Sequence, residues 1–310
     1  MKRIILAKPR GFCAGVERAI RSVEQALAVY GPPVYVLNAI VHNETVVQGL
    51  RGKGAVFVRD LNDVPHGSHL LFSAHGVGLA QWAAARERGL HVIDATCPLV
   101  EKVHREARRF AEDGCAIILI GEKGHDEVVG TAGWAPDHIQ VVFSEEEAAT
   151  VSVPDPDRVA YLTQTTLSVE DASRVIEALR RRFPAIRGPQ ADDICYATQN
   201  RQRAVIELAP QADLVLVVGD PASANSKRLA EICGKKGKPS HLIASALLIQ
   251  DAWLQDAETV LVTSGASVPE SLVRGVVEHL AGKGFLAVEE HEVAHENVHF
   301  GLPEAFKEDH

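Results

Sequence analysis

Residues 91–121, HVIDATCPLVEKVHREARRFAEDGCAIILIG, show most clearly how the chain is built. A short apolar run, HVIDA (91–95), leads through a cysteine into the amphipathic segment PLVEKVHREARRFAED (98–113), and a second apolar run, CAIILIG (115–121), follows. Short continuous apolar runs are typical of buried parallel strands, whereas the segment between them has the apolar period of a helix. This stretch predicts a strand, a helix opened by a cysteine, and a second strand.

The same alternation of strand-like and helix-like segments recurs along the chain. Because strands that alternate with helices indicate a parallel sheet covered by helices, the sequence predicts the α/β class. The other clear pairs are RIILA (3–7) with CAGVERAIRSVEQAL (13–27), DLVLVVG (213–219) with ANSKRLAEICGKK (224–236), and ETVLVTSG (258–265) with PESLVRGVVEHLAG (269–282).

Composition excludes several classes of function. Asp and Glu number 41 against 32 Lys and Arg, so the net charge of -9 provides no basic surface for nucleic acid or for an anionic membrane. The apolar run near the N-terminus, Ile4–Ala7, is too short for a signal peptide, and later apolar runs have the length of strands. We expect a cytoplasmic protein with no nucleic-acid or membrane partner.

Five cysteines are spread along the 310 residues, an odd number that does not fit a secreted disulfide framework. Three of them follow a loop or strand end and open a helical segment at intervals of 84 and 98 residues: Cys13, Cys97 and Cys195. This regularity predicts three similar α/β lobes in a pseudo-threefold arrangement that brings the three cysteines together. The expected lobes are residues 14–96, residues 97–193, and residues 194–310 with a C-terminal tail; residues 1–13 form a strand and loop that pack with the third lobe.

The partial positive charge at a helix N-terminus favours the thiolate form of a cysteine, which is either a nucleophile or a metal ligand. Three such thiolates suit a metal centre better than covalent catalysis, and no short C-x₂₋₄-C pair points to zinc. A [4Fe-4S] cluster takes one thiolate per iron, so three cysteines leave one iron open for chemistry. Cys115 and Cys233 do not lie at strand-to-helix junctions, and we expect them in the core.

Other polar residues lie at the carboxyl ends of predicted strands, where ligands bind in open α/β sheets. Loops rich in glycine, serine and asparagine that lead into helices also offer anion sites. The residues of this kind are His42, His75, His125, Ser223, Asn225, Ser226 and Ser267. Glu127 fits either a carboxylate stabilised by a helix N-terminus or a proton donor, and the hydroxyls of Thr165, Thr166 and Thr198 are candidates for the same centre.

A series of ten short motifs covers almost the whole chain, and the motifs and their order resemble those of the LytB (IspH) family of 4-hydroxy-3-methylbut-2-enyl diphosphate reductases. The family performs the last step of the methylerythritol phosphate route to isoprenoids. The motifs are GFCAGV (11–16), VHN (41–43), SAHG (73–76), DATCP (94–98), GHDEVVGT (124–131), TQTTLS (163–168), DICYATQNRQ (193–202), NSKRL (225–229), TSGAS (263–267) and ENVHFGLP (296–303).

The resemblance implies a trefoil of three α/β lobes around one [4Fe-4S] cluster per chain, held by Cys13, Cys97 and Cys195. It also implies that Glu127 delivers protons, with Thr165 assisting at the substrate hydroxyl bound to the open iron. The remaining substrate-binding residues that it implies, for the diphosphate, are His42, His75, His125, Ser223, Asn225 and Ser267. Two electrons and protons would expel water and leave isopentenyl and dimethylallyl diphosphates.

The implied electron donor is a ferredoxin or a flavodoxin, and the resemblance favours a monomer. One loop departs from the family pattern, because Ala222 and Ala224 stand where polar side chains are common. Their backbone N–H groups remain available as donors in this interpretation. Two other readings stay open: a three-cysteine [4Fe-4S] Lewis-acid enzyme of the quinolinate-synthase or dehydratase kind, and a redox sensor, although no DNA- or protein-binding module is visible.

Overall fold

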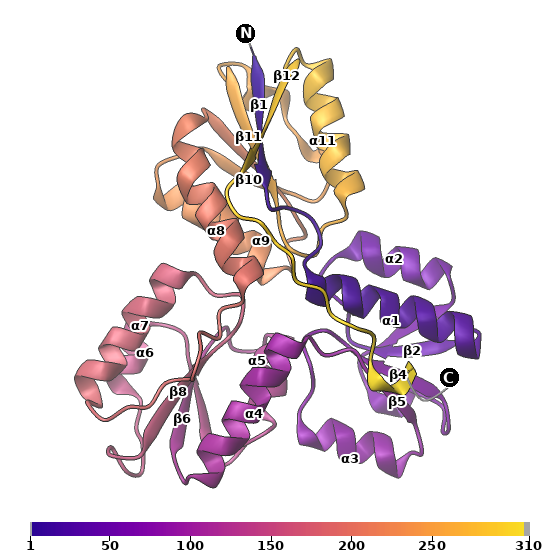
Figure 1. Ribbon diagram of the computed structural model, residues 1–310, viewed down its shortest axis with the longest axis vertical. Coiled ribbons are helices and arrows are strands. Elements are labelled where there is room, and N and C mark those ends of the chain that lie inside the picture. Colours follow the sequence, from indigo (N-terminus) through magenta and orange to yellow (C-terminus); the bar gives the residue numbers. More distant parts are fainter. Residues whose placement is uncertain (1, 307–310) are drawn as a thin grey trace. The chain divides into compact units, whose positions relative to one another are not determined.

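The computed structural model of the chain describes residues 2–306, which form three β-sheets flanked by helices (Figure 1). Every strand pairing between named strands is parallel. The α/β class and the buried parallel strands predicted from the apolar runs are therefore confirmed. The described chain divides into two compact units: the first comprises residues up to 14, 42–46 and 196–299, and the second comprises 15–41, 47–195 and 300 onward.

The first unit contains the five-stranded sheet. Its strands in spatial order are β10 (Ser240–Ile243), β9 (Leu214–Val218), β11 (Thr259–Ser264), β1 (Arg3–Lys8) and β12 (Ala287–Glu292). The helices along this part of the chain are α8 (Tyr196–Leu208), α9 (Ala224–Lys235), α10 (Asp251–Leu254) and α11 (Glu270–Gly282). Strand β1 thus lies between β11 and β12, which come from the far end of the sequence.

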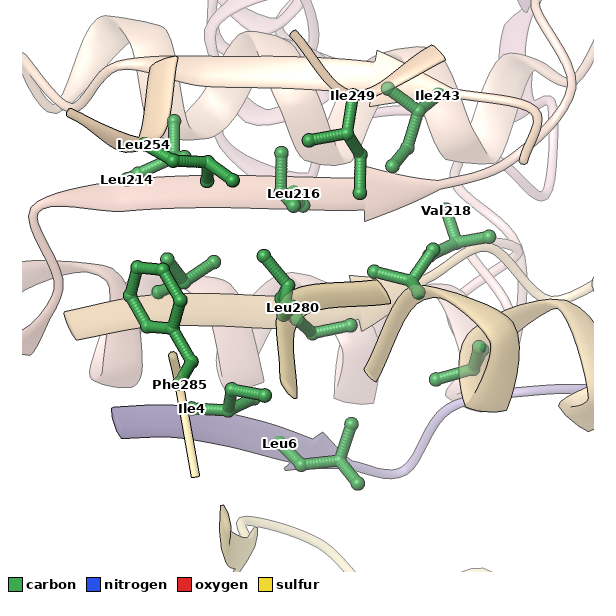
Figure 2. Packing of buried hydrophobic residues seen from close by; sticks show 14 of the residues in the cluster. Ile4, Leu6, Leu214, Leu216, Val218, Ile243, Ile249, Leu254, Leu280 and Phe285 are labelled. Carbon is green, nitrogen blue, oxygen red and sulfur yellow. The ribbon is translucent and has the colours of Figure 1, made fainter. Parts of the chain in front are cut away.

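Alternating side chains of these strands fill two separate cores, because successive residues of a strand point to opposite faces. Leu214 and Leu216 of β9 pack on the side of α11, where Leu280 is fully buried, and Figure 2 shows them together with Ile4 of β1. Val215 of β9 instead packs on the side of α8 and α9. Burial on both faces explains why these strands are continuous apolar runs.

The second unit contains a four-stranded and a three-stranded sheet. The first has the order β3 (Ala55–Val58), β2 (Val34–Leu37), β4 (His69–Phe72) and β5 (His91–Asp94), and the second has the order β7 (Ile139–Val142), β6 (Ala116–Ile120) and β8 (Val159–Thr163). The remaining α-helices are α1 (Ala14–Tyr30), α2 (Glu44–Gly52), α3 (Leu79–Glu87), α4 (Pro98–Glu112), α5 (Asp126–Ala132), α6 (Glu145–Thr150) and α7 (Val169–Arg182).

The two strands of residues 91–121 belong to different sheets. Strand β5 is the edge of the four-stranded sheet, whereas β6 is the central strand of the three-stranded sheet, so α4 connects the two. Ile117 and Leu119 of β6 face α4 and α5, and Ile118 and Ile120 face α6 and α7. The central position of β6, with helices on both faces, agrees with its uninterrupted apolar sequence.

Short 3₁₀ helices complete the described structure at Leu61–Asp63, Ala209–Gln211, Ala246–Leu248 and Glu304–Phe306. Among the described residues, no helix has the length and apolar character that a membrane span requires. The expected C-terminal tail begins with strand β12, and its last four residues, 307–310, lie outside the described residues. The expected boundaries between lobes stay a prediction.

Candidate functional site

Each of the three predicted cysteine ligands directly precedes a helix. Cys13 precedes α1, Cys97 is the extended N-cap residue of α4, and Cys195 precedes α8, as the sequence predicted. All three are half-buried. Their backbone N–H groups donate to loop carbonyls: Cys13 to Ala266 at 3.0 Å, Cys97 to Ala74 at 3.0 Å and Cys195 to Thr165 at 3.1 Å.

The other two cysteines lie in hydrophobic cores, as expected. Cys115 is 2% exposed next to β6, and Cys233 on α9 is fully buried. Burial raises the pKa of the Cys233 thiol to about 12, because the apolar surroundings disfavour the thiolate. Such a thiol is chemically inert, which separates it from the three half-buried cysteines.

Glu127 and Thr165 form a buried acid–hydroxyl pair within the second unit. Glu127, in the first turn of α5, is only 3% exposed. Its Oε1 accepts the Thr165 backbone N–H at 2.6 Å, and its Oε2 accepts the Thr165 hydroxyl at 2.9 Å. Because the Thr165 carbonyl also accepts the Cys195 N–H, one threonine connects the acid to the backbone of a predicted ligand.

Two of the three predicted histidines come together beside this pair. His125 is the N-cap residue of α5, and its Nδ1 accepts the Glu127 N–H at 3.2 Å. A neutral ring that accepts at Nδ1 carries its proton on Nε2, where it can donate to an anion. His75 meets His125 edge to face with 5.7 Å between ring centroids, and its Nδ1 lies 3.3 Å from the Ser73 hydroxyl.

Glycines allow α5 to approach the loop that carries His75. A Cβ on Gly130 of α5 would lie 2.9 Å from the Gly76 carbonyl oxygen, closer than side chains tolerate. Gly76 itself has a φ of 72°, which favours glycine, and its own Cβ would lie 2.5 Å from Cε1 of His104. Gly76 of the SAHG motif and Gly130 of the GHDEVVGT motif are therefore required by the close packing of these two segments.

His104 on α4 lies beneath this contact and has a structural role. It is 4% exposed, stacks on Trp134 at 5.2 Å, and its Nε2 has no hydrogen-bond partner in the described part of the chain. Burial lowers the pKa of His104 from its usual 6.5 to about 4, and the nearby Arg105 charge acts in the same direction. The ring is therefore neutral at physiological pH.

The remaining predicted ligand-binding residues lie in the first unit. Ser267 donates its hydroxyl to the His42 carbonyl at 3.1 Å, which fixes the loop that carries this histidine. Ser223 is the N-cap residue of α9, where its Oγ accepts from the Ser226 N–H at 3.3 Å and from the Ser226 hydroxyl at 3.1 Å. Part of the hydrogen-bonding capacity of Ser223 is thus used inside the loop.

Asn225 differs from these residues because its side chain is buried without a partner. Only 4% of the residue is exposed, and neither its Oδ1 nor its Nδ2 has a hydrogen-bond partner among the residues the structure describes. A buried amide in this state is unfavourable by about 1–3 kcal/mol, so it is a candidate to bind a ligand that supplies the missing hydrogen bonds. The expectation that the Ala222 backbone N–H is available to a ligand is wrong, because this N–H already donates to Asp220 Oδ1 at 2.8 Å.

The sequence did not single out three basic residues that bond next to the cysteines: Arg18, Lys102 and Arg201. Their positions, five or six residues after Cys13, Cys97 and Cys195, could have revealed them. Asp193, the partner of Lys102, was likewise missed. Burial raises its pKa to about 6, although its bond with Lys102 acts to lower it.

Comparison with known proteins agrees with the motifs found in the sequence. The model of the family described as LytB protein matches residues 4–281. The chain belongs to the LytB protein family. Among curated LytB relatives, the 4-hydroxy-3-methylbut-2-enyl diphosphate reductase of Acidothermus cellulolyticus is 56% identical over 97% of this chain and 89% of its own length. The enzyme of the same name from Leifsonia xyli subsp. xyli is 53% identical, over 99% of this chain and 92% of its own length.

Solved structures of LytB-type reductases share the fold. The E-1-hydroxy-2-methyl-but-2-enyl-4-diphosphate reductase from Plasmodium falciparum superposes with a TM-score of 0.96 at 38% identity, over 99% of this chain and 97% of that chain. A second structure, described as (E)-4-hydroxy-3-methyl-but-2-enyl diphosphate reductase, the terminal enzyme of the non-mevalonate pathway, gives a TM-score of 0.64 at 31% identity. It covers 91% of this chain and all of that chain. This LytB chain therefore has the fold of those reductases.

Proposed function

We propose that this chain is an oxidoreductase that removes the hydroxyl group of (E)-4-hydroxy-3-methylbut-2-enyl diphosphate. Two electrons and two protons convert the allylic alcohol into isopentenyl or dimethylallyl diphosphate and one water, the last step of the methylerythritol phosphate pathway. The observation that carries this proposal is the buried Glu127–Thr165 pair, bonded through the Thr165 carbonyl to Cys195. It provides a proton source next to a cysteine of the predicted redox centre.

The cysteines fit an iron–sulfur centre by their chemistry. Three half-buried thiols precede three helices, whereas the two remaining thiols are buried in cores. We propose that Cys13, Cys97 and Cys195 hold one [4Fe-4S] cluster per chain and leave one iron without a cysteine. Such a cluster supplies single electrons and, at its open iron, a Lewis acid for the substrate oxygen.

Glu127 holds the proton that makes the departing hydroxyl leave as water. Thr165 Oγ donates to Glu127 Oε2 when the acid is ionised, and it can accept from that oxygen when the acid is protonated. In the second state the Thr165 hydroxyl is free to donate to the substrate oxygen. The pair therefore passes a proton from Glu127 through Thr165, and the burial of both residues excludes competing water.

Neutral donors hold the diphosphate in this proposal. The unpartnered Asn225 amide donates to a phosphate oxygen, and Ser223, Ser267 and the histidines His42, His75 and His125 supply further hydrogen bonds. Hydrogen bonds to a charged acceptor are roughly twice as strong as neutral ones. An acidic chain with a net charge of -9 can therefore bind a diphosphate in a local pocket without a basic surface.

The Lewis-acid enzyme without net reduction and the redox sensor are not favoured, because the relatives over nearly the full chain are named reductases. The electron donor belongs to the proposal as a ferredoxin or a flavodoxin. We likewise propose a monomer in the cytoplasm.

Turnover tests the proposed function. The chain is reconstituted anaerobically with iron and sulfide, then mixed with a chemical reductant and the allylic diphosphate. We expect both isomeric five-carbon diphosphates, detected by mass spectrometry after dephosphorylation. A fully loaded protein that releases neither product contradicts the proposal, and a product formed without consumption of the reductant indicates the Lewis-acid alternative.

Cysteine variants test the ligand assignment. Cys97→Ser removes one thiolate, so we expect the reconstituted protein to lose most of its iron and the visible absorption of the cluster. Cys115→Ser changes a buried thiol near β6 and serves as the matched control, with iron content equal to that of the parent. Equal iron content in both variants contradicts the assignment.

A further inference from the structure

Each helix that follows a predicted ligand carries a basic residue at a corresponding position. Arg18 on α1 comes five residues after Cys13, Lys102 on α4 comes five after Cys97, and Arg201 on α8 comes six after Cys195. Arg18 is 8% exposed, Arg201 is fully buried, and the Lys102 side chain is 22% exposed. Three long cations buried to this extent need strong partners.

Arg18 binds the chain that leads to the second cysteine. Its Nη1 donates to the carbonyl of Thr96 at 2.8 Å, and Thr96 directly precedes Cys97. Its Nη2 donates over a longer distance of 3.4 Å to the carbonyl of Asp94, at the end of β5. The helix that follows Cys13 therefore holds the loop that carries Cys97.

Lys102 makes the corresponding contact with the loop before the third cysteine. Its Nζ donates to Oδ1 of Asp193 at 2.7 Å, two residues before Cys195, and also to the Ala191 carbonyl. The other oxygen of Asp193 accepts the Thr163 N–H at 2.9 Å, at the end of β8. The helix that follows Cys97 therefore holds the loop of Cys195 and joins it to the strand that leads to Thr165.

Arg201 makes the third contact of this kind, with the loop before the first cysteine. Its Nη2 donates to the carbonyl of Gly11 at 2.9 Å, two residues before Cys13. Its Nη1 donates to Oε1 of Glu296 at 3.1 Å and to the Ala197 carbonyl of its own helix at 2.9 Å. The helix that follows Cys195 therefore holds the loop that carries Cys13.

We propose that Arg18, Lys102 and Arg201 are positioning residues that act in a cycle. Each lies on the helix of one cysteine and fixes the segment before another: Arg18 acts on Cys97, Lys102 on Cys195, and Arg201 on Cys13. Charge-assisted hydrogen bonds from buried cations are stronger than the backbone contacts of an ordinary loop. The cycle sets the three cysteine loops before iron arrives and slows the loss of iron afterwards.

The late motif ENVHFGLP belongs to the same device. Arg18 Nε donates to the Gly301 carbonyl at 2.9 Å, and Arg201 binds Glu296, which also accepts from Asn200 at 3.0 Å. Two of the three positioning residues thus also bond to the segment from Glu296 to Gly301. This segment fixes the guanidinium groups at an orientation from which they reach the cysteine loops.

Directionality separates this proposal from ordinary stabilisation. If a cation only stabilised its unit, its replacement would speed amide exchange in all nearby loops or mainly in its own helix. The cycle instead predicts that removal of one cation loosens the cysteine on a different helix. Lys238 offers a matched control, because its Nζ also donates to backbone carbonyls, those of Pro210 at 3.1 Å and Ala212 at 2.9 Å. These carbonyls do not belong to the segments that precede the three predicted cysteine ligands.

Residue-resolved amide hydrogen exchange on the full chain measures this loosening, because the N–H groups of Cys13, Cys97 and Cys195 are all hydrogen-bonded. In Arg18→Gln we expect the Cys97 amide to exchange about tenfold faster, with the Cys13 and Cys195 amides changed less than about twofold. Lys102→Gln should affect the Cys195 amide alone. Lys238→Gln should leave all three unchanged.

Arg201 is fully buried beside Glu296, so Arg201→Lys accompanies Arg201→Gln in case the latter does not fold. The lysine keeps the charge but lacks the fork that reaches both Gly11 and Glu296, and it should loosen the Cys13 amide alone. Conversely, Lys102→Arg should restore protection at Cys195. Uniform loosening of all three amides, or loosening only of the cysteine on the mutated helix, overturns the proposal.

The proposal rests on the proposed function only in treating the cysteines as iron ligands. Hydrogen exchange is measured without iron or substrate. A chain that shows no turnover can therefore still show the predicted exchange pattern, and a chain that lacks this pattern can still turn over. A second readout uses the loaded protein: iron release to a chelator should be faster by a similar factor in each variant than in Lys238→Gln. Release at the control rate from all three variants also overturns the proposal.

Discussion

Glu127 and Asn225 are both buried polar residues of the proposed site, but their surroundings are opposite. Glu127, in the second unit, is 3% exposed, and both of its oxygens accept hydrogen bonds from Thr165. Asn225, in the first unit, is 4% exposed, and neither of its amide atoms has a partner among the described residues. The Glu127 carboxylate thus has hydrogen-bond partners within its own unit, whereas the Asn225 amide has none among the described residues.

This difference indicates a division of labour. An acid that must deliver a proton at a fixed place benefits from being held before substrate arrives, because its geometry then costs nothing during the reaction. An amide that only binds can remain unpartnered, since the bound ligand supplies its hydrogen bonds. We therefore expect Glu127 to affect the rate of the chemical step and Asn225 to affect binding.

The largest expected effect comes from Glu127→Gln. Glutamine keeps the shape and one acceptor for Thr165 but removes the acid, so kcat should fall by about 10²–10⁴. Iron content and substrate affinity should remain those of the parent. The measurement is anaerobic turnover at saturating substrate.

Glu147→Gln is the control for this loss of charge, because Glu147 pairs with Lys123 at the surface of the second unit. We expect its kcat to equal that of the parent. A kcat for Glu127→Gln within about threefold of the parent would remove Glu127 from the proton path.

A smaller effect tests whether an unpartnered buried group must be a binding group. The Nε2 atom of His104 also has no partner in the described chain, yet we assign it no ligand. Its pKa falls from 6.5 unfolded to about 4 folded, so its stabilising neutral form is complete above pH 6.5 and is lost as the pH falls toward 4. Between pH 7 and 4.5 this change weakens folding by about 2 kcal/mol.

His104→Phe removes the titrating group and keeps a ring against Trp134. Urea unfolding at pH 7 and pH 4.5 should show an acid-induced loss of stability about 2 kcal/mol smaller in the variant than in the parent. An identical loss in both proteins would show that His104 is not the titrating group. Turnover at pH 7 should stay near that of the parent if His104 has no ligand role.

The smallest expected change in stability comes from Asn225→Leu. Leucine fills a similar volume without polar atoms, so the ligand-free chain should be equally stable or more stable by about 1 kcal/mol. Substrate affinity should fall by about tenfold to hundredfold, since the amide's bond to a charged phosphate is lost. Urea unfolding and calorimetric titration measure the two effects.

Thr263→Val is the matched control in the same unit. The Thr263 hydroxyl is also buried without a partner among the described residues, but we assign it no contact with substrate. We expect its stability to change as in Asn225→Leu and its affinity to stay that of the parent. A loss of stability in Asn225→Leu without a loss of affinity would make Asn225 a structural residue.

The sequence allowed the local features to be predicted, since these depend on neighbours in the chain. The apolar period revealed strands and helices, and the positions of Cys13, Cys97 and Cys195 before helices followed from it. The neighbours of a strand within its sheet depend on distant residues, so the order of the strands in the three sheets was not predicted. The pairing of the Ala222 N–H with Asp220 was missed because such a turn bond is set by the loop conformation.

The site shows the same limit. The residue types at strand ends indicated Glu127, Thr165 and Asn225, but not that two of them bond to each other while the third is left unpaired. Burial and hydrogen-bond partners arise only when segments far apart in sequence meet. The basic residues after each cysteine repeat at a regular spacing, yet the acceptors next to the cysteines lie far away in the sequence: 78 residues separate Arg18 from Thr96, and 190 separate Arg201 from Gly11.

Equilibrium binding of the allylic diphosphate to the oxidised, cluster-loaded chain tests the division of labour most directly. Titration calorimetry compares the parent with Glu127→Gln and Asn225→Leu under the same anaerobic conditions. We predict an unchanged Kd for Glu127→Gln and a Kd weaker by about tenfold or more for Asn225→Leu. A weakened Kd for Glu127→Gln together with an unchanged Kd for Asn225→Leu would contradict it.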